Sequence, residues 1–255
     1  MAVQHQNWIF GVSDFSTTEP LQNAGEIIAS GLDFIEPGLA KAAALGHAEF
    51  ESAVARIKDA GIRVQSMNWF LPPDLKVVGP DVSHAACRRF LERALQRADH
   101  LEARAIVFGS PGSRSIPVGF SEAKAREQLI EFCYLTADLI NEAQYGMKLA
   151  VEHVNHTETN HLNTFAQALD LVREVDRPEI GLAADFYHFS MEDESSDIML
   201  EAGDLIHAVQ IANPAGRCFP RPDIEIPGLA KFFENLAAID FQGGISVEAT
   251  VSGSL

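Results

Sequence analysis

Two patterns of hydrophobic and polar positions alternate along the chain. Short, nearly continuous apolar runs, such as 105–108 and 148–151, are typical of strands buried on both faces of a parallel sheet. Longer segments between them repeat apolar residues every three or four positions, as Phe90, Leu91, Ala94 do within 83–101, which indicates helices with one buried face. Strands are predicted at 8–13, 33–36, 62–67, 105–108, 148–152, 181–185, 208–210 and 244–248.

The predicted helices lie between these strands and carry recognisable start and stop signals. Thr18 and Ser121 are capping hydroxyls at the start of two helices, Asn163 is the expected cap of another, and Gly61 and Gly146 end the helices that precede them. The helices are expected at 18–30, 48–60, 83–101, 121–145, from 163 onward, between 193 and 202, and at 228–239.

Eight strands alternating with seven helices predict an α/β protein, a (β/α)8 TIM barrel. The 255 residues match the usual size of this fold, and no linker or compositional break divides them, so residues 1–255 are expected to form one domain. Only seven residues follow Glu248, which predicts a short or missing eighth helix. The outer face of the last strand would then be partly exposed or covered by a partner subunit. A homo-oligomer is therefore one of the two arrangements that the sequence allows.

The charge composition of the chain disfavours some classes of binding partner. The 19 basic and 36 acidic residues give a formal net charge of −17, which repels nucleic acid and anionic membrane surfaces. The sequence has no apolar run of membrane-spanning length, no secretory signal pattern and no paired cysteines, so we expect a cytoplasmic protein with reduced thiols and a small-molecule substrate.

Polar side chains close four consecutive predicted strands: Glu152, Asp185, Gln210 and Glu248. In a closed barrel these ends meet at the C-terminal mouth, where barrels of this kind carry their active sites. Three carboxylates that are buried together without a counter-charge repel one another, and a divalent cation is the simplest remedy. Oxygen ligands favour Mn2+ or Mg2+, with Co2+ or Zn2+ as further possibilities.

Such an ion would polarise a substrate carbonyl and stabilise an enediolate. Glu152 and Glu248 enter from different sides of the ring of strands. We therefore predict that these two glutamates take and return a proton on opposite faces of a planar intermediate.

The motifs in the second half of the chain resemble those of the sugar phosphate isomerase/epimerase superfamily, the xylose isomerase-like barrels. The resemblance spans nearly the whole chain and rests on Glu152-x-x-Asn155-x-x-Glu158, Asp185-x-x-His188, the segment 209–217 and Val247-Glu248. It implies that Glu152, Asp185, Gln210 and Glu248 bind the metal, that Glu152 and Glu248 are catalytic, and that Glu158, His188 and Arg217 contact the substrate.

Two features place the chain near the hydroxypyruvate isomerases as well as the ketose 3-epimerases. Ketose epimerases usually carry histidine at the third metal position, where this chain has Gln210, as hydroxypyruvate isomerases do. After Arg217, hydroxypyruvate isomerases typically continue into a Pro-Gly-x-Gly turn, whereas this chain reads Phe219-Pro-Arg-Pro-Asp223, so Arg221 is expected to add a second cation near an acidic substrate. The resemblance implies a metal-dependent isomerase or epimerase of a small hydroxy-ketone, keto-acid or sugar.

Three alternatives use the same barrel. A lyase, such as an inosose or dehydroshikimate dehydratase, would begin with the same proton removal, and a non-catalytic scaffold would keep only the fold. A DNA-repair endonuclease is disfavoured by the charge and by the lack of histidines at 66–68 and 108–110. The backbone amides of the 109–114 loop and Arg114 could hold an anion, but the loop lacks the Lys-Ser/Thr ending of a phosphate-binding loop, which disfavours this reading.

Overall fold

The computed structural model describes residues 8–14 and 23–250. Its strands form one parallel sheet in the order β3-β2-β1-β9-β8-β7-β6-β5-β4. The strands are β1 (Ile9–Ser13), β2 (Phe34–Glu36), β3 (Arg63–Val64), β4 (Ser66–Met67), β5 (Ala105–Phe108), β6 (Lys148–Glu152), β7 (Ile180–Asp185), β8 (Ile206–Ile211) and β9 (Gly244–Val247).

The predicted third strand is split between two neighbours. Arg63–Val64 pairs with β2, and Ser66–Met67 pairs with β5, with Gln65 between the two short segments. Because one continuous stretch of chain therefore joins both edges of the sheet, the sheet closes on itself. The structure confirms the TIM barrel, and every predicted strand has a counterpart in it.

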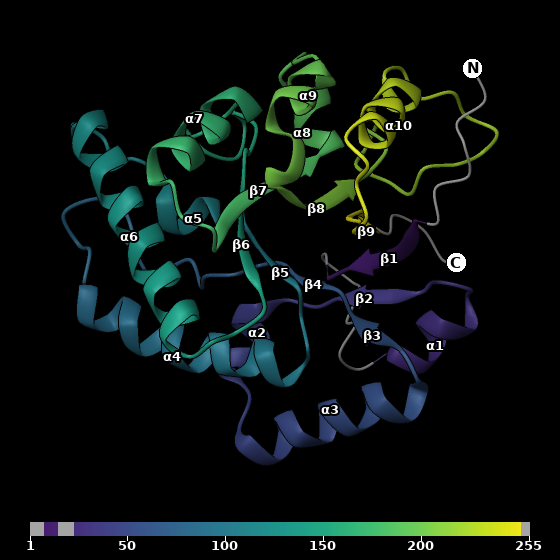
Figure 1. Ribbon diagram of the computed structural model, residues 1–255, viewed down its shortest axis with the longest axis horizontal. Helices are drawn as coiled ribbons and strands as arrows, with labels where there is room; N and C mark the ends of the chain where they lie inside the picture. Colours follow the sequence, from purple (N-terminus) through teal and green to yellow (C-terminus); the bar gives the residue numbers. More distant parts are fainter. Residues whose placement is uncertain (1–7, 15–22, 251–255) are drawn as a thin grey trace.

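Helices surround the strands, with α3 and α4 along the lower side of the view in Figure 1 and α8 to α10 along the upper side. The α-helices are α1 (Ala24–Ala29), α2 (Leu39–Ala44), α3 (His47–Ala60), α4 (His84–His100), α5 (Pro111–Arg114), α6 (Glu122–Glu142), α7 (Phe165–Val175), α8 (Phe186–Met191), α9 (Met199–Ala202) and α10 (Leu229–Ala238). Two 3-10 turns, η1 (Ser196–Ile198) and η2 (Gly203–Leu205), flank α9. The described residues after β9, 248–250, form no helix, and the rest of the region where the eighth helix is expected to be short or missing lies outside the described residues.

Several helix boundaries differ from those predicted. The cap of α7 is Thr164, whose hydroxyl accepts from the Gln167 amide, whereas Asn163 donates its side-chain N–H groups to the carbonyls of Val154 and Thr159. Asn163 thus closes the loop after β6 rather than starting the helix. The predicted start of the first helix, at Thr18, lies outside the described residues.

Short helices directly follow three strands and were not predicted. α2, α5 and α8 begin within three residues of the ends of β2, β5 and β7, and each has only four to six residues. A segment this short shows no helical period, and Pro37-Gly38 before α2 indicates a stop rather than a start.

The core has two parts. Large side chains fill the space between strands and helices, where Phe70 packs edge-on against Phe108 at a ring separation of 5.6 Å. A second, small cluster of Ala105, Val107, Ala150, Ala183 and Ala208 lies apart from it. Toward the C-terminal ends of the strands the buried layer becomes polar, and Glu36 accepts hydrogen bonds there from Ser66, Gln210 and Ser246.

Candidate active site

The polar ends of β6 to β9 converge at one end of the barrel. Asp185 pairs in register with Gln210, so these side chains occupy the same level of neighbouring strands. Glu152 ends β6, and Glu248 follows β9 directly. All four side chains are buried, with Glu248 the most exposed at 7%.

Asp185 connects the barrel to the helix that carries His188. Its Oδ1 accepts from the Tyr187 amide at 2.9 Å and caps α8, which turns Oδ2 toward His188. The Nε2 atom of His188 lies 3.5 Å from that oxygen and 3.4 Å from Oε1 of Glu152. Ligand atoms of Glu152, Asp185 and His188 all lie within 4.8 Å of one another, close enough to share one metal ion.

Asn155 fixes the tautomer of His188. Its backbone and side-chain N–H groups lie 3.2 and 2.8 Å from Nδ1 of the ring, which must accept and therefore carries no proton. The proton of the neutral ring then sits on Nε2 and faces the carboxylates. Burial lowers the pKa of His188 against the opposing effect of Asp185, so the ring is neutral near pH 7.

Arg217 connects the proposed substrate residues to the last acid. Its Nη1 donates to Glu158 at 3.1 Å, and its Nη2 donates to Glu248 at 2.8 Å and lies 3.6 Å from Oδ2 of Asp185. The guanidinium also lies over the ring of Tyr187, 4.4 Å from its centroid. The structure thus brings the predicted substrate-binding side chains Glu158, His188 and Arg217 to the same site as the acids.

The chain turns sharply just before Arg217. Gly216 and Arg217 both have positive φ, +79° and +47°, and this left-handed turn after β8 brings the guanidinium back over the barrel. The side chain of Asn155 donates to Glu158 at 2.9 Å and so holds the acid that Nη1 of Arg217 contacts.

Two further polar residues belong to this site and were not among the predicted site residues. Asn68, just after β4, donates to Oε1 of Glu248 at 3.1 Å and to the carbonyl of Asp14 at 3.0 Å. Glu36, at the end of β2, accepts from Nε2 of Gln210 at 2.6 Å. The position of Glu36 at the end of a predicted strand is a signal that sequence reasoning can use, whereas the sequence around Asn68 gives no such signal.

The side chains present fit a divalent cation. The Oδ2 atom of Asp185 and the Oε1 atom of Gln210 are buried and lack a hydrogen-bond donor among the described residues. Buried oxygens without donors are costly unless a cation or water satisfies them. Oxygens of this kind suit Mg2+ or Mn2+. Glu248 is engaged with Arg217 and Asn68 and lies outside the compact group of Glu152, Asp185 and His188.

Burial dominates the electrostatics of the acids. It raises the pKa of Glu152 to about 8 despite the nearby guanidinium groups of Arg114 and Arg217, and it raises the pKa of Asp185 and, further still, that of Glu248. Burial alone would lower the pKa of Arg217, but the surrounding carboxylates hold it above its usual range. A cation at this site would stabilise the charged form of these buried carboxylates and displace their protons.

A cavity of about 80 Å3 opens beside these groups. Glu152, Glu158, His188, Arg217 and Glu248 form its polar side, and Trp69, Leu71 and Val107 are among its apolar neighbours. Trp69 is 51% exposed at this cavity and donates its indole N–H to the carbonyl of Asp14 at 2.6 Å. A polar side facing an apolar side suits a small polyhydroxylated molecule.

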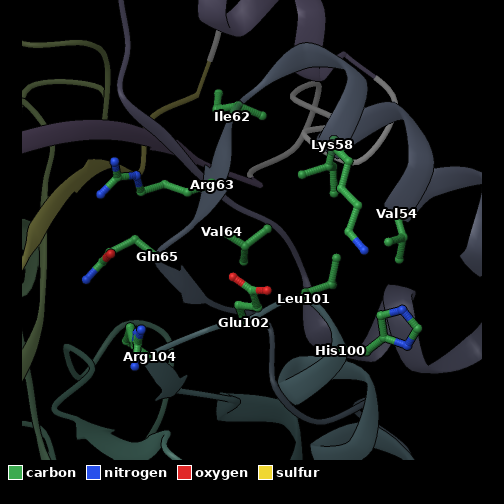
Figure 2. A pocket seen from close by; sticks show the side chains of 11 residues that line it. Val54, Lys58, Ile62, Arg63, Val64, Gln65, His100, Leu101, Glu102 and Arg104 are labelled. Atoms are coloured by element: carbon green, nitrogen blue, oxygen red, sulfur yellow. The ribbon is translucent and has the colours of Figure 1, made fainter.

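Figure 2 shows another hollow, of about 310 Å3. Ile62, Leu101 and Arg104 in its lining precede β3 and β5, so it lies at the N-terminal end of the barrel, opposite the acids. Arg63 and Val64 begin a strand there, and Lys58 and His100 belong to the last turns of α3 and α4. Lys58 lies near the negative end of the α3 dipole, where a cation is stabilising without any ligand. Barrels of this fold place their chemistry at the other end.

The structure agrees that the 109–114 loop is a poor anion site. Pro111–Arg114 forms α5, and Arg114 is fully buried, donating from Nη1 to the Phe108 carbonyl at 3.2 Å, so a ligand from solvent has no access to it. Gly109 instead makes room for Glu152, because a Cβ at this position would collide with Oε2 of that side chain.

A parallel barrel with acids gathered at its C-terminal end belongs to the TIM-barrel class of proteins. Residues 25–253 match the family described as xylose isomerase-like TIM barrel, and the chain belongs to that family. No helix in the part of the chain that the structure describes is long and apolar enough to cross a membrane.

Relatives with assigned activities match shorter stretches. The chain is 32% identical over 108 residues to an L-ribulose 3-epimerase of Methylomonas sp. (strain DH-1), covering 42% of this chain and 37% of that protein. It is 51% identical over 45 residues to an inosose isomerase of Bacillus licheniformis, covering 18% and 16% of the two chains. The aligned stretches thus span well under half of these relatives.

Solved structures share the fold over nearly the whole chain. The 3-keto-D-glucoside 4-epimerase of E. coli superposes with a TM-score of 0.81 at 20% identity, covering 98% of this chain and 94% of the other. The D-psicose 3-epimerase of Clostridium cellulolyticum gives a TM-score of 0.82 at 18% identity, covering 96% and 86%. At this identity the likeness establishes the fold alone.

Proposed function

We propose that the protein is a divalent-metal-dependent isomerase or epimerase of a small polyhydroxy ketone or related keto-acid. The observation that carries this proposal is the convergence of Glu152, Asp185, Gln210 and Glu248 at one end of the barrel, beside a cavity that Glu158, His188 and Arg217 also reach or border. The partial matches to ketose 3-epimerases and inosose isomerases support the same reaction class.

Glu152, Asp185, Gln210 and Glu248 would hold the ion, and the Nε2–H of His188 faces the same acids. When bound, the ion supplies Lewis-acid polarisation of the substrate carbonyl. The carboxylate of Glu152 or Glu248 removes the proton from the neighbouring carbon, and the other returns one on the opposite face. Arg217 and Glu158 orient substrate hydroxyl or carboxylate oxygens, and the Nε2–H of His188 donates a hydrogen bond to a substrate oxygen.

A dehydratase would share the first proton transfer, and no feature of the described residues favours it. A scaffold without activity would leave the buried Oε1 of Gln210 without a partner among the described residues. One-domain organisation, a cytoplasmic location and self-association remain predictions.

Hydrogen exchange at carbon tests the proposal directly. The metal-stripped protein is given Mn2+ in D2O with ketoses, an inosose and hydroxypyruvate, and deuterium incorporation beside the carbonyl is followed by NMR. We expect incorporation into at least one substrate, lost on adding chelator and in Glu152→Gln. Absence of exchange across the panel, with Mn2+ bound, would contradict the proposal.

A further inference from the structure

A buried carboxylate on the opposite side of the barrel holds Gln210. Glu36 ends β2, whereas Gln210 lies in β8, and the strands β1 and β9 separate the two in the sheet. The hydrogen bond from Nε2 of Gln210 to Oε1 of Glu36, 2.6 Å long, therefore crosses the interior of the barrel. Glu36 is fully buried and Gln210 nearly so, at 0% and 1% exposure.

Glu36 is surrounded by donors. Besides Gln210, the hydroxyl of Ser246 donates to Oε1 at 2.9 Å and the hydroxyl of Ser66 donates to Oε2. Both carboxyl oxygens of Glu36 therefore act as acceptors, and the Gln210 amide turns its NH2 group toward Oε1. The carboxylate is thus held in one place by side chains of β4, β8 and β9.

This arrangement decides which way the amide of Gln210 points. A glutamine amide can turn by 180° and exchange its oxygen and nitrogen, with little change in shape. Facing Glu36 with its NH2 group leaves Oε1 on the other side, where it is buried and has no donor among residues 8–14 and 23–250. The neighbouring strand places Asp185 in register with Gln210, and Oδ2 of Asp185 likewise lacks a donor.

We propose that Glu36 is a positioning residue that fixes the Gln210 amide with its oxygen toward the ion. The inference rests on the proposed function, since it concerns the same metal site. A neutral amide is a useful ligand only through its oxygen, and the reversed amide would direct two N–H donors at the cation. Residues that orient metal ligands in this way commonly affect metal affinity by 10- to 100-fold.

The test measures Mn2+ affinity rather than activity. The full-length protein is stripped with chelator, and Mn2+ binding is followed by calorimetry and by the EPR signal of the free ion. Glu36→Gln keeps the size of the side chain but can accept or donate, so the amide of Gln210 loses its fixed direction. We expect the Mn2+ dissociation constant to rise at least about tenfold.

Ser66→Ala is the matched control, because it removes one donor to Glu36 and leaves the bond to Gln210 in place. We expect its Mn2+ affinity to stay within about threefold of wild type, well short of the tenfold range of orienting residues. Equal losses in Ser66→Ala and Glu36→Gln would mean that Mn2+ affinity responds to any change around Glu36, and would overturn the inference.

Exchanging the carboxylate and the amide between positions 36 and 210 gives a measurement that a merely structural role of Glu36 would not change. In the Gln210→Glu background, position 210 carries a carboxylate and needs a donor from position 36. Glu36→Gln should therefore tighten Mn2+ binding in that background while it weakens binding in the wild type. A change of the same sign in both backgrounds would overturn the inference, as would a lower melting temperature with an unchanged dissociation constant.

Mn2+ binding distinguishes a failure of the proposed function from a failure of the role of Glu36. Wild-type protein that binds no stoichiometric Mn2+ would overturn the proposed function itself. Wild-type protein that binds one Mn2+, together with a Glu36→Gln variant of unchanged affinity, would overturn only the role of Glu36. Should Glu36→Gln fail to fold, the comparison of Gln210→Glu with the double variant still tests the inference. Tighter Mn2+ binding in the double variant would support the role of Glu36, and weaker binding would overturn it.

Discussion

The guanidinium of Arg217 donates from Nη2 to Oε2 of Glu248 across 2.8 Å, in a site where both side chains are about nine-tenths buried. The same nitrogen lies 3.6 Å from Asp185, and Nη1 reaches Glu158. One cation on the chain therefore contacts acids from three different strand ends or loops. This relationship makes Arg217 important for the stability of the acid cluster as well as for the proposed substrate.

Arg217→Ala should lower the free energy of unfolding of the chelator-treated protein by about 3 kcal/mol, because it leaves buried acids without their counter-charge. Urea denaturation at pH 8 measures the difference. The control is Arg126→Ala, which breaks a surface pair with Glu174 whose side chains are 35% and 53% exposed, and should cost at most about 1 kcal/mol. Equal losses in the two variants would show that the Arg217 pairs contribute no more than surface contacts.

Glu152→Gln and Glu248→Gln should each reduce turnover by about 10²- to 10⁴-fold while the far-UV circular dichroism stays unchanged, because each removes a proton-transfer group. Glu131→Gln changes an exposed acid on α6 and should leave turnover at the wild-type level. Near-full activity in either active-site variant on the true substrate would refute the two-glutamate scheme.

The stability of the metal-free protein should fall as pH rises from about 7 to 8.5. Burial raises the pKa of Glu152 to about 8, and the pKa of Asp185 and Glu248 is also raised, so the folded state holds protons that the unfolded state has lost above about pH 4.5. Buried His153, His161 and His188 have lowered pKa values, and their opposite effect is complete near pH 7.

Thermal unfolding in chelator across this range measures the slope. Mn2+ affinity should rise over the same interval, because the ion must displace protons from the carboxylates. Calorimetry in buffers of different ionisation enthalpy then reports proton release. Stability that rises with pH above 7 in the metal-free protein would contradict the assigned burial of these acids.

Gln210→His should shift metal preference toward Co2+ and Zn2+, since an imidazole nitrogen is a softer ligand than an amide oxygen. Competition between Mn2+ and Co2+ for the stripped protein measures the change. Unchanged selectivity would mean that Gln210 does not contact the ion.

Much of the barrel could be predicted because its strands and long helices carry strong periodic signals. The run 105–108 and the helix around Phe90 both occur where the pattern places them. The division of the third strand at Gln65 was not predictable, because it arises from pairing with two neighbours distant in the sequence. The cap at Thr164 was missed because Asn163 is an equally good capping residue by type.

The site could be predicted only as far as strand ends reveal it. Glu152, Asp185 and Gln210 end or nearly end strands, so the topology alone brings them together. The connection between Glu36 and Gln210, and that between Asn68 and Glu248, join residues 174 and 180 positions apart. Nothing local in the sequence encodes such contacts. The sequence of the 109–114 loop also does not reveal that Arg114 is buried, because that burial depends on packing against other parts of the chain.

The central claim is that side-chain oxygens from β6 to β9 hold one divalent ion. Titration of the chelator-stripped, full-length protein with Mn2+, followed by EPR of the free ion, tests it most directly. The account predicts one tightly bound Mn2+ per chain in the wild type and loss of that site in the Glu152→Gln, Glu248→Gln double variant. Wild-type protein that leaves all the Mn2+ free, or a double variant that binds it as tightly, would contradict the account.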